Sequence, residues 1–469
     1  MKSRVLSALL LCASVATPRA STAEPSDPLL PSAGGGLGRG ANLASDDARV
    51  TLPARLTLDD ALKILRERGL DLLIADAAIE SAEGDVTAAG AIQNPNVSGG
   101  LYRSFFSGHL YESHLGWFVG VGDSSAIEDV LSGKRGLRQE VAHQALAAAR
   151  LSRSDAQRTL ELAVAQLYTQ VAAAEAAVTF SREVQKSTVK SDDLTKVRFH
   201  AGAISEAEAG KIHITKLEAD QAVATALQGL AQAKAALAFV LGVRGPAPQF
   251  EVDPLPPSRA PPALATASLD ELLKRAFDNR PDLKLSTAQI NRAHASLALA
   301  RRLRFPDIAL NLQYEQEGSV SGTAYVDQSG NPVVAAGITP PTLQLSLTAT
   351  LPLFYQQQGE IRKAEADVRT QLLGAGKVGA QILSDVTSSY AAFQGSRELV
   401  TRMETEMLAQ VARVRDLVEI QYQKGAASLL DYLDAYRTYI ATNVEYIQDL
   451  AAYWSAEHAL EGAVATRFE

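Results

Sequence analysis

Apolar residues recur every three or four positions along a long proline-free stretch between Gly133 and His200. From Leu160 they step by four and three, a spacing that places them on one side of a helix as a coiled-coil seam: Leu160, Val164, Leu167, Val171, Ala174 and Val178. At about 1.5 Å per residue, a continuous helix over this stretch is roughly 100 Å long. The pattern therefore predicts a rod several times longer than an ordinary domain helix.

A second proline-free stretch follows Gly359, and each stretch is interrupted once by a glycine that follows basic or aromatic residues. A glycine in this position is typical of a helix C-cap, which we expect at Gly202 and Gly425. Each stretch is therefore expected to fold back as an antiparallel helical hairpin, over 127–243 and 359–465.

Between the helical segments the period of the pattern changes to two. After Pro306, apolar residues alternate with polar ones in two runs, which contain Ile308, Leu310, Leu312 and Tyr314, and then Leu343, Leu345 and Leu347. Such runs predict strands with one apolar and one polar face. We expect a β-hairpin at about 307–352, whose strands are joined by a loop rich in Gly, Ser, Asn and Pro. Weaker alternation after Pro95 predicts a second hairpin at about 96–121.

The two halves of the chain align without a gap over their first helices. Leu58 and Leu269 are 211 residues apart, and so are Pro95 and Pro306. The first of these helices is expected to open at the N-cap Thr57 and to run to about Ile92. The alignment indicates an internal duplication of a helix-strand-strand-helix-helix unit. We expect the repeats at 56–245 and 267–469, joined by a Pro-rich linker at 246–266.

The N-terminus predicts export. Lys2 and Arg4 precede a short apolar run that ends at small residues, which is typical of a signal peptide over residues 1–23. Residues 24–55 are expected to form an extended leader. The single cysteine, Cys12, lies inside the signal, and its lipidation remains an alternative to simple removal. No later run is apolar enough to predict a helical membrane anchor.

Net charge and motifs exclude several classes of function. The whole chain carries a formal charge of −8, and removal of the signal deletes three basic residues and no acid, which leaves −11. An acidic chain is a poor nucleic-acid binder. The sequence contains no phosphate-binding loop, zinc-protease motif or nucleophile elbow, so neither an enzyme nor a cofactor is expected. His109 and His114 lack the spacing of a metal site.

The predicted strands require more than one chain. Four amphipathic strands leave two open edges, which hydrocarbon does not tolerate. Several chains must therefore close one barrel together. Aromatic residues in the first strand pair fit either a membrane-interface girdle or buried strand packing: Tyr102, Trp117 and Phe118.

The order of these elements resembles that of the TolC-like outer-membrane factors. Two stretches at 89–95 and 133–135 resemble the heavy-metal efflux branch of that family. The resemblance implies a mainly α fold with a small β part. It also implies a homotrimer whose 12-stranded outer-membrane β-barrel, surrounded by lipid, is continued by a periplasmic α-helical barrel.

The resemblance also implies residues for the periplasmic end of such a channel. A constriction would be lined by Glu208, Tyr422, Asp431 and Asp434, and the tip that contacts an adaptor would contain Gly202, Ala203, Lys424, Gly425 and Ala426. An arginine of the family's closed-state network would fall on Ala427, so that part of the network is missing or built differently.

Helical periodicity gives an independent reason to examine the two aspartates. With Leu429 set at zero and 100° per residue, Leu433 and Tyr436 fall within about 40° of it, whereas Asp431 and Asp434 fall on the opposite side. The acids either line a channel or belong to a solvated face near a helix N-terminus. Glu208, close to Ile204 and Ile212, is as compatible with partial packing as with a channel wall.

The function expected from the resemblance is a passive exit duct of a tripartite efflux system. Its partners would be a periplasmic adaptor and an inner-membrane pump of the RND type. Two alternatives remain: the exit duct of a type I protein secretion system, and an exported structural coiled-coil protein.

Overall fold

The computed structural model describes residues 52–103, 115–123, 126–245, 249–259, 264, 267–317, 323–326, 328–335 and 341–468. The expected signal peptide, Cys12, His109 and His114 lie outside these residues. The described part is rich in helix and contains few strands, as expected for the mainly α fold class.

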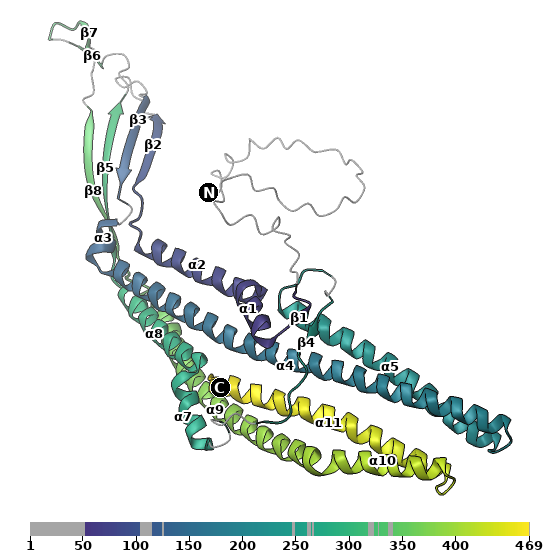
Figure 1. Ribbon diagram of the computed structural model, residues 1–469. Coiled ribbons are helices and arrows are strands. Elements are labelled where there is room, and N and C mark those ends of the chain that lie inside the picture. The colour runs from purple at the N-terminus through teal and green to yellow at the C-terminus, as the bar shows by residue number, and fades with distance from the viewer. Residues whose placement is uncertain are drawn as a thin grey trace, which may run out of the picture. The chain divides into compact units, whose positions relative to one another are not determined.

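The elements of the first half and of the linker are β1 (Arg55–Leu56), α1 (Leu58–Arg68), α2 (Leu70–Gly90), β2 (Asn96–Arg103), β3 (Leu115–Gly122), α3 (Ala126–Leu131), α4 (Lys134–His200), α5 (Glu206–Val240) and, within the linker, β4 (Glu251–Val252). Those of the second half are α7 (Leu269–Asn279), α8 (Pro281–Arg302), β5 (Asp307–Glu317), β6 (Thr323–Val326), β7 (Pro332–Ala335), β8 (Thr342–Thr350), α9 (Gln358–Arg402), a π-helical turn (Met403–Met407), α10 (Leu408–Gln423) and α11 (Leu429–Val464). In Figure 1, α5 runs beside α4 and α11 runs beside α10.

The first predicted helix is two helices, so its expected continuity was wrong. It opens at Thr57, whose hydroxyl accepts a hydrogen bond from the amide of Asp60 (3.1 Å), but it breaks at Gly69. A side chain at residue 69 would lie 2.6 Å from the carbonyl oxygen of Leu65, so the chain turns there through a glycine. The second half breaks at Arg280, because a residue before proline avoids the helical region.

The second rod contains a π-helical turn that the sequence pattern did not predict. Glu404 lies in this turn and accepts hydrogen bonds from the amide (3.1 Å) and hydroxyl (2.7 Å) of Ser258 and from the hydroxyl of Tyr446 (3.0 Å). Bulges of this kind turn a side chain out of the regular helical register. Glu404 thereby holds the linker between the two halves against α11.

Four strands form one antiparallel sheet in the order β2-β3-β5-β8. The register aligns the apolar residues of neighbouring strands, such as Leu310 with Leu347 and Tyr314 with Leu343. One face is consequently apolar, and the other carries residues such as Asn311 and Gln313. The expected loop between β5 and β8 contains a further hairpin, β6 paired with β7.

Alternation along β2 and β3 places the three aromatic residues of the predicted girdle on different faces of the sheet. Trp117 lies on the apolar face beside Tyr314, with ring centroids 5.9 Å apart. Phe118 lies on the opposite face, where its ring closely approaches Gly100, and the register places Tyr102 on that same face. Of the three aromatic residues, Trp117 alone lies on the apolar face of the described sheet.

Two apolar cores hold the helices together. The first joins α1, the middle of α4 and the end of α5, through Leu65, Val171 and Leu237. The second joins α7, α9 and α11, through Phe393 and Tyr453. All five side chains are fully buried.

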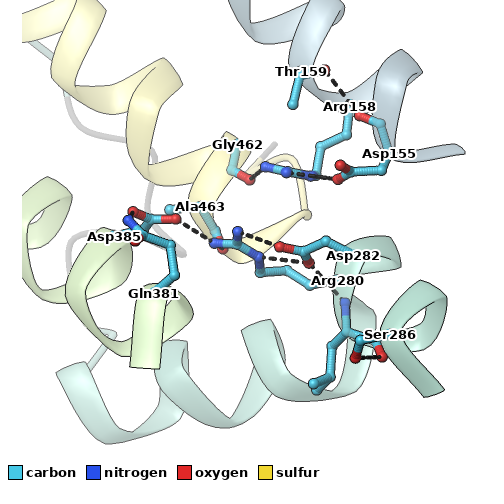
Figure 2. Close-up of polar contacts among 11 residues, drawn as sticks. Asp155, Arg158, Thr159, Arg280, Asp282, Ser286, Gln381, Asp385, Gly462 and Ala463 are labelled. Atoms are coloured by element: carbon cyan, nitrogen blue, oxygen red, sulfur yellow. Dashed lines mark hydrogen bonds and ion pairs between the residues drawn. The ribbon is translucent and has the colours of Figure 1, made fainter. Parts of the chain in front are cut away.

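A buried polar network lies where helices of the two halves meet, and Figure 2 shows its contacts. Arg280 is 3% exposed and binds both oxygens of Asp282 (3.0 and 2.7 Å) and one oxygen of Asp385 (2.9 Å). Burial alone would raise the pKa of Asp282, but the hydrogen bonds and charge of Arg280 lower it overall. Arg158 of α4 donates to the carbonyl of Gly462 on α11 (2.9 Å).

A second buried cation joins the sheet to the first rod. Lys134, the first residue of α4, places its Nζ 2.6 Å from Asp307, 2.9 Å from the carbonyl oxygen of Phe305 and 3.1 Å from Glu128. Burial of this ammonium opposes its charge, but the hydrogen bonds to Asp307 and Glu128 prevail and raise the pKa of Lys134. The base of β5 is thereby attached to the start of α4.

Replacing Arg280 tests the polar network. We expect Arg280→Met to lower the free energy of local opening by about 3 kcal/mol, because it leaves two carboxylates without their cation. The measurement is hydrogen exchange of α8 and of the end of α11. Arg275→Met removes an exposed pair with Glu271 and should change the free energy of local opening by less than about 0.5 kcal/mol.

Because the pKa of Asp282 is lowered, the contribution of Arg280 to stability is present above about pH 4 and is lost as the pH falls through the lowered pKa.

Candidate functional site at the helical turns

The two long hairpins turn by the same local device. Gly202 and Gly425 have φ angles of 70° and 75°, which favour glycine, and each turn is followed by a serine that caps the next helix. Capping boxes pair Ser205 with Glu208 and Ser428 with Asp431.

Both capping acids are residues that the resemblance placed at the constriction. One oxygen of Asp431 accepts hydrogen bonds from the hydroxyl (2.6 Å) and amide (3.0 Å) of Ser428, and these bonds lower the pKa of Asp431. Glu208 accepts from the amide and hydroxyl of Ser205, both at 2.9 Å, and its pKa is lowered in the same way. Placement near a helix N-terminus was one of the two alternatives expected for Asp431 and Asp434, whereas the reciprocal capping boxes were not predicted.

The start of α11 has the two faces that its periodicity predicts. Leu429, Leu433 and Tyr436 are buried, whereas Asp431 and Asp434 are exposed. Among the described contacts, the side chain of Asp434 has no capping bond of the kind that Asp431 makes. The two acids therefore differ in their local structure although they share one exposed face.

A row of stacked tyrosines links the second hairpin to the first. Tyr422 of α10 stacks on Tyr432 of α11 with ring centroids 5.1 Å apart, and Tyr432 stacks on Tyr436 at 5.9 Å. The hydroxyl of Tyr432 lies 3.2 Å from that of Ser191 on α4, and Tyr436 donates to the carbonyl of Val184 (3.3 Å). Tyr422 is therefore connected to α4 through the ring of Tyr432.

An arginine of the first hairpin reaches the end of the second. Arg198 donates to the carbonyl of Gln423 (3.2 Å), and its guanidinium carbon lies 5.7 Å from the centroid of the Tyr422 ring. Position 427 holds an alanine. The arginine beside Tyr422 is Arg198 of α4. The remaining expected tip residues are exposed around the two turns: Ala203, Lys424 and Ala426.

A buried acid below the first turn is a residue that the sequence analysis missed. Asp192 is 2% exposed and pairs with Lys196 (2.7 Å) and with His213 of α5 (3.4 Å). Burial alone would raise its pKa, but the bonds from Lys196 and His213 lower it overall. No group of three His, Cys, Asp or Glu suited to a metal ion occurs within the described ranges.

Comparison with models of known protein families identifies the family to which these hairpins and this sheet belong. The model of the outer membrane efflux proteins matches residues 61–243 and 272–466, which include both hairpins. The chain belongs to the outer membrane efflux protein family. The predicted resemblance to the TolC-like factors is confirmed.

Individual outer membrane efflux proteins are similar over most of their length. The cobalt-zinc-cadmium resistance protein CzcC of Cupriavidus metallidurans is 23% identical over 420 residues, which span 87% of this chain and 89% of CzcC. The pyoverdine export outer membrane protein OpmQ of Pseudomonas putida is 25% identical over 401 residues, which span 81% and 80%. The crystal structure of the outer membrane protein VceC from Vibrio cholerae matches with a TM-score of 0.69 at 17% identity, covering 88% of this chain and 97% of VceC.

As an outer membrane efflux protein, this chain is an efflux channel of the outer membrane, and the expected class of function and location are confirmed. Members of this family act as transport ducts. The structure also shows a contact that the sequence could not predict: Arg198 donates to the carbonyl of Gln423, although the two residues are 225 positions apart in the chain. The one sequence signal was the basic and aromatic composition of the helix end at 198–200.

Tyr432 provides a test of the link between the hairpins. Tyr432→Ala removes the ring between Tyr422 and Tyr436 and should lower the free energy of local opening of α10 and the start of α11 by about 3 kcal/mol. Tyr432→Phe keeps the ring, loses the contact with Ser191 and should cost about 1 kcal/mol. Hydrogen exchange of these segments is the measurement. Equal exchange rates in both variants would show that stacking does not hold the hairpins together.

Proposed function

We propose that three copies of this chain assemble into one outer-membrane barrel of twelve strands, continued across the periplasm by their long helices. The sheet carries this proposal. Its order leaves β2 and β8 as edges, each with one neighbour within the described sheet, and three four-stranded sheets joined edge to edge remove every edge. Three chains are the number that the family resemblance implies.

Exposed apolar surface supports this assembly at two places. On the sheet, Leu101, Leu343 and Leu347 are 77%, 68% and 69% exposed, as expected for a face that meets lipid. Among the described helices, α5 alone is long and apolar enough by composition to cross a membrane, yet it packs along α4. Its exposed Ile214 and Leu217 would be covered by a neighbouring chain in the proposed helical barrel.

The duplicated unit follows from the same proposal. Each half of the chain contributes two strands to the sheet and one long helical hairpin, in the same order. Two repeats in each of three chains would make a wall of six similar units. The turns at Gly202 and Gly425 would then gather at one end, where a periplasmic adaptor would dock and connect the duct to an inner-membrane pump of the RND type.

The constriction is proposed at that end. Glu208, Tyr422, Asp431 and Asp434 lie at or beside the two turns, and three copies would gather their carboxylates around one axis. Like charges at such a ring favour cations and oppose anions. The exposed face of α11 that carries Asp431 and Asp434 supports this placement, because the opposite face of the helix is used for packing.

The assembly can be tested by fractionation and gel mobility. We expect the full chain in the outer-membrane fraction, migrating as a trimer in detergent without heating and as a monomer after heating, because edge-to-edge strand pairing is cooperative and closed. A soluble periplasmic monomer would instead favour the alternative of an exported coiled-coil protein.

Substitution of both aspartates tests the constriction. We expect Asp431→Asn with Asp434→Asn to raise single-channel conductance several-fold and to reduce cation selectivity, because the ring loses six charges while an amide still offers the Ser428 cap an acceptor oxygen. Planar-bilayer recording measures both quantities. Unchanged conductance and selectivity would remove the constriction hypothesis.

A matched control separates charge from helix capping. Ser428→Ala weakens the cap by about 1 kcal/mol but keeps both acids. It should leave cation selectivity unchanged if charge is the cause. A loss of selectivity in Ser428→Ala as large as in the double variant would assign the effect to helix capping.

A further inference from the structure

A cavity of about 590 Å³ lies between α1, α4, the junction of α7 with α8, and the end of α11. Its walls combine apolar side chains, including Leu62, Leu162 and Phe468, with polar and charged ones. Along α4, Arg158 on this wall is about 65 Å from the turn at Gly202. The cavity is therefore separate from the proposed constriction.

One wall residue is a buried carboxylate without a partner. Glu457 of α11 is 4% exposed, and its Oε2 is buried with no hydrogen-bond partner within the described part of the chain. Burial, and secondarily the nearby charge of Glu461, raise the pKa of Glu457 to about 7. Other buried acids of this protein have cations: Asp129 binds Arg138, and Asp192 binds Lys196.

The cations around the cavity are engaged elsewhere. Arg158 pairs with Asp155 (2.7 Å) and donates to the carbonyl of Gly462 (2.9 Å). Two charged pairs face the cavity from other elements: Glu161 of α4 with Arg66 of α1 at 2.7 Å, and Asp59 of α1 with Arg467 at 3.6 Å. On α11 itself, His458 lies 3.5 Å from Glu461, and the buried hydroxyl of Tyr453 interacts electrostatically with Glu457. Arg280, next to the wall residues Asn279 and Pro281, binds Asp282 and Asp385. Glu457 is left with negative charge and no counterion among the described residues once it ionises.

We propose that this cavity binds a small organic cation, a protonated amine with an apolar body, whose ammonium group pairs with Glu457. An unpaired buried charge is strongly unfavourable, and a cation of this kind supplies the missing counterion. The apolar walls fit the body of the amine, as in other small-molecule sites. A divalent metal fits less well, since no three metal-binding side chains converge within the described residues.

The experiment uses the full protein in detergent and phenethylammonium chloride as the probe, with binding measured calorimetrically. Glu457 is charged above about pH 7 and neutral below it, whereas the amine stays protonated throughout this range. Binding should therefore be about tenfold tighter at pH 8 than at pH 6. The neutral analogue 2-phenylethanol should bind at least tenfold more weakly than the ammonium at pH 8.

Two variants complete the test. Glu457→Gln keeps the shape of the side chain and should weaken ammonium binding at least tenfold at pH 8 and remove its pH dependence. Glu445→Gln changes an exposed acid of the same helix and should bind as wild type does. Without amine, Glu457→Gln should unfold at a higher temperature than wild type above pH 7, which checks that the variant folds and that the native carboxylate is buried.

Three results would overturn the proposal: equal ammonium binding by wild type and Glu457→Gln, equal binding of the alcohol, or Zn²⁺ binding to this site in preference to the amine. Because binding is measured without ion flow, these results are independent of the trimer and conductance experiments.

Discussion

The packing of other helices along α4 is the constraint on which the rest of the structure depends. Helices α1, α2, α5, α8 and α11 all contact this one continuous helix of 67 residues. Close approach requires small residues at the contacts: a side chain at Gly462 of α11 would meet Leu162 of α4 at 2.8 Å. The abundance of alanine on α4 and the scarcity of aromatic residues in the chain follow from this arrangement.

Each region of α4 is attached to the second half of the chain by a different kind of contact. At its start, Lys134 binds Asp307 at the base of the sheet. In its middle, Arg158 binds the carbonyl of Gly462 on α11. Near its end, Ser191 contacts Tyr432. Cations make the first two of these contacts, whereas a tyrosine hydroxyl makes the contact near the turn. Both halves are thus held to one rod along its length.

The elements that could be predicted from the sequence are those that a local pattern determines. The heptads of α4, the alternation in β5 and β8, and the glycine turns are properties of neighbouring residues, and these elements are found. The π-helical turn at Met403–Met407 has no local breaker; it depends on Glu404 meeting Ser258, which lies 146 residues earlier. Arg198 and Glu457 could not be identified for the same reason, since a pairing or its absence depends on side chains distant in the sequence. The break at Gly69 was missed although glycine is a local signal, because its strength depends on close approach to Leu65.

Helix capping and an exposed channel charge are compatible at Asp431. The Oδ2 atom accepts both hydrogen bonds from Ser428, and the residue as a whole stays exposed. A carboxylate is a stronger acceptor than a neutral group beside the positive end of a helix, and the hydrogen bonds from Ser428 lower the pKa of Asp431. The same bonds therefore hold a negative charge at a defined place beside the turn. Asp434, one turn further along the same exposed face, adds a second charge without a capping bond among the described contacts, so the aspartate at 431 is explained by helix capping while that at 434 is not.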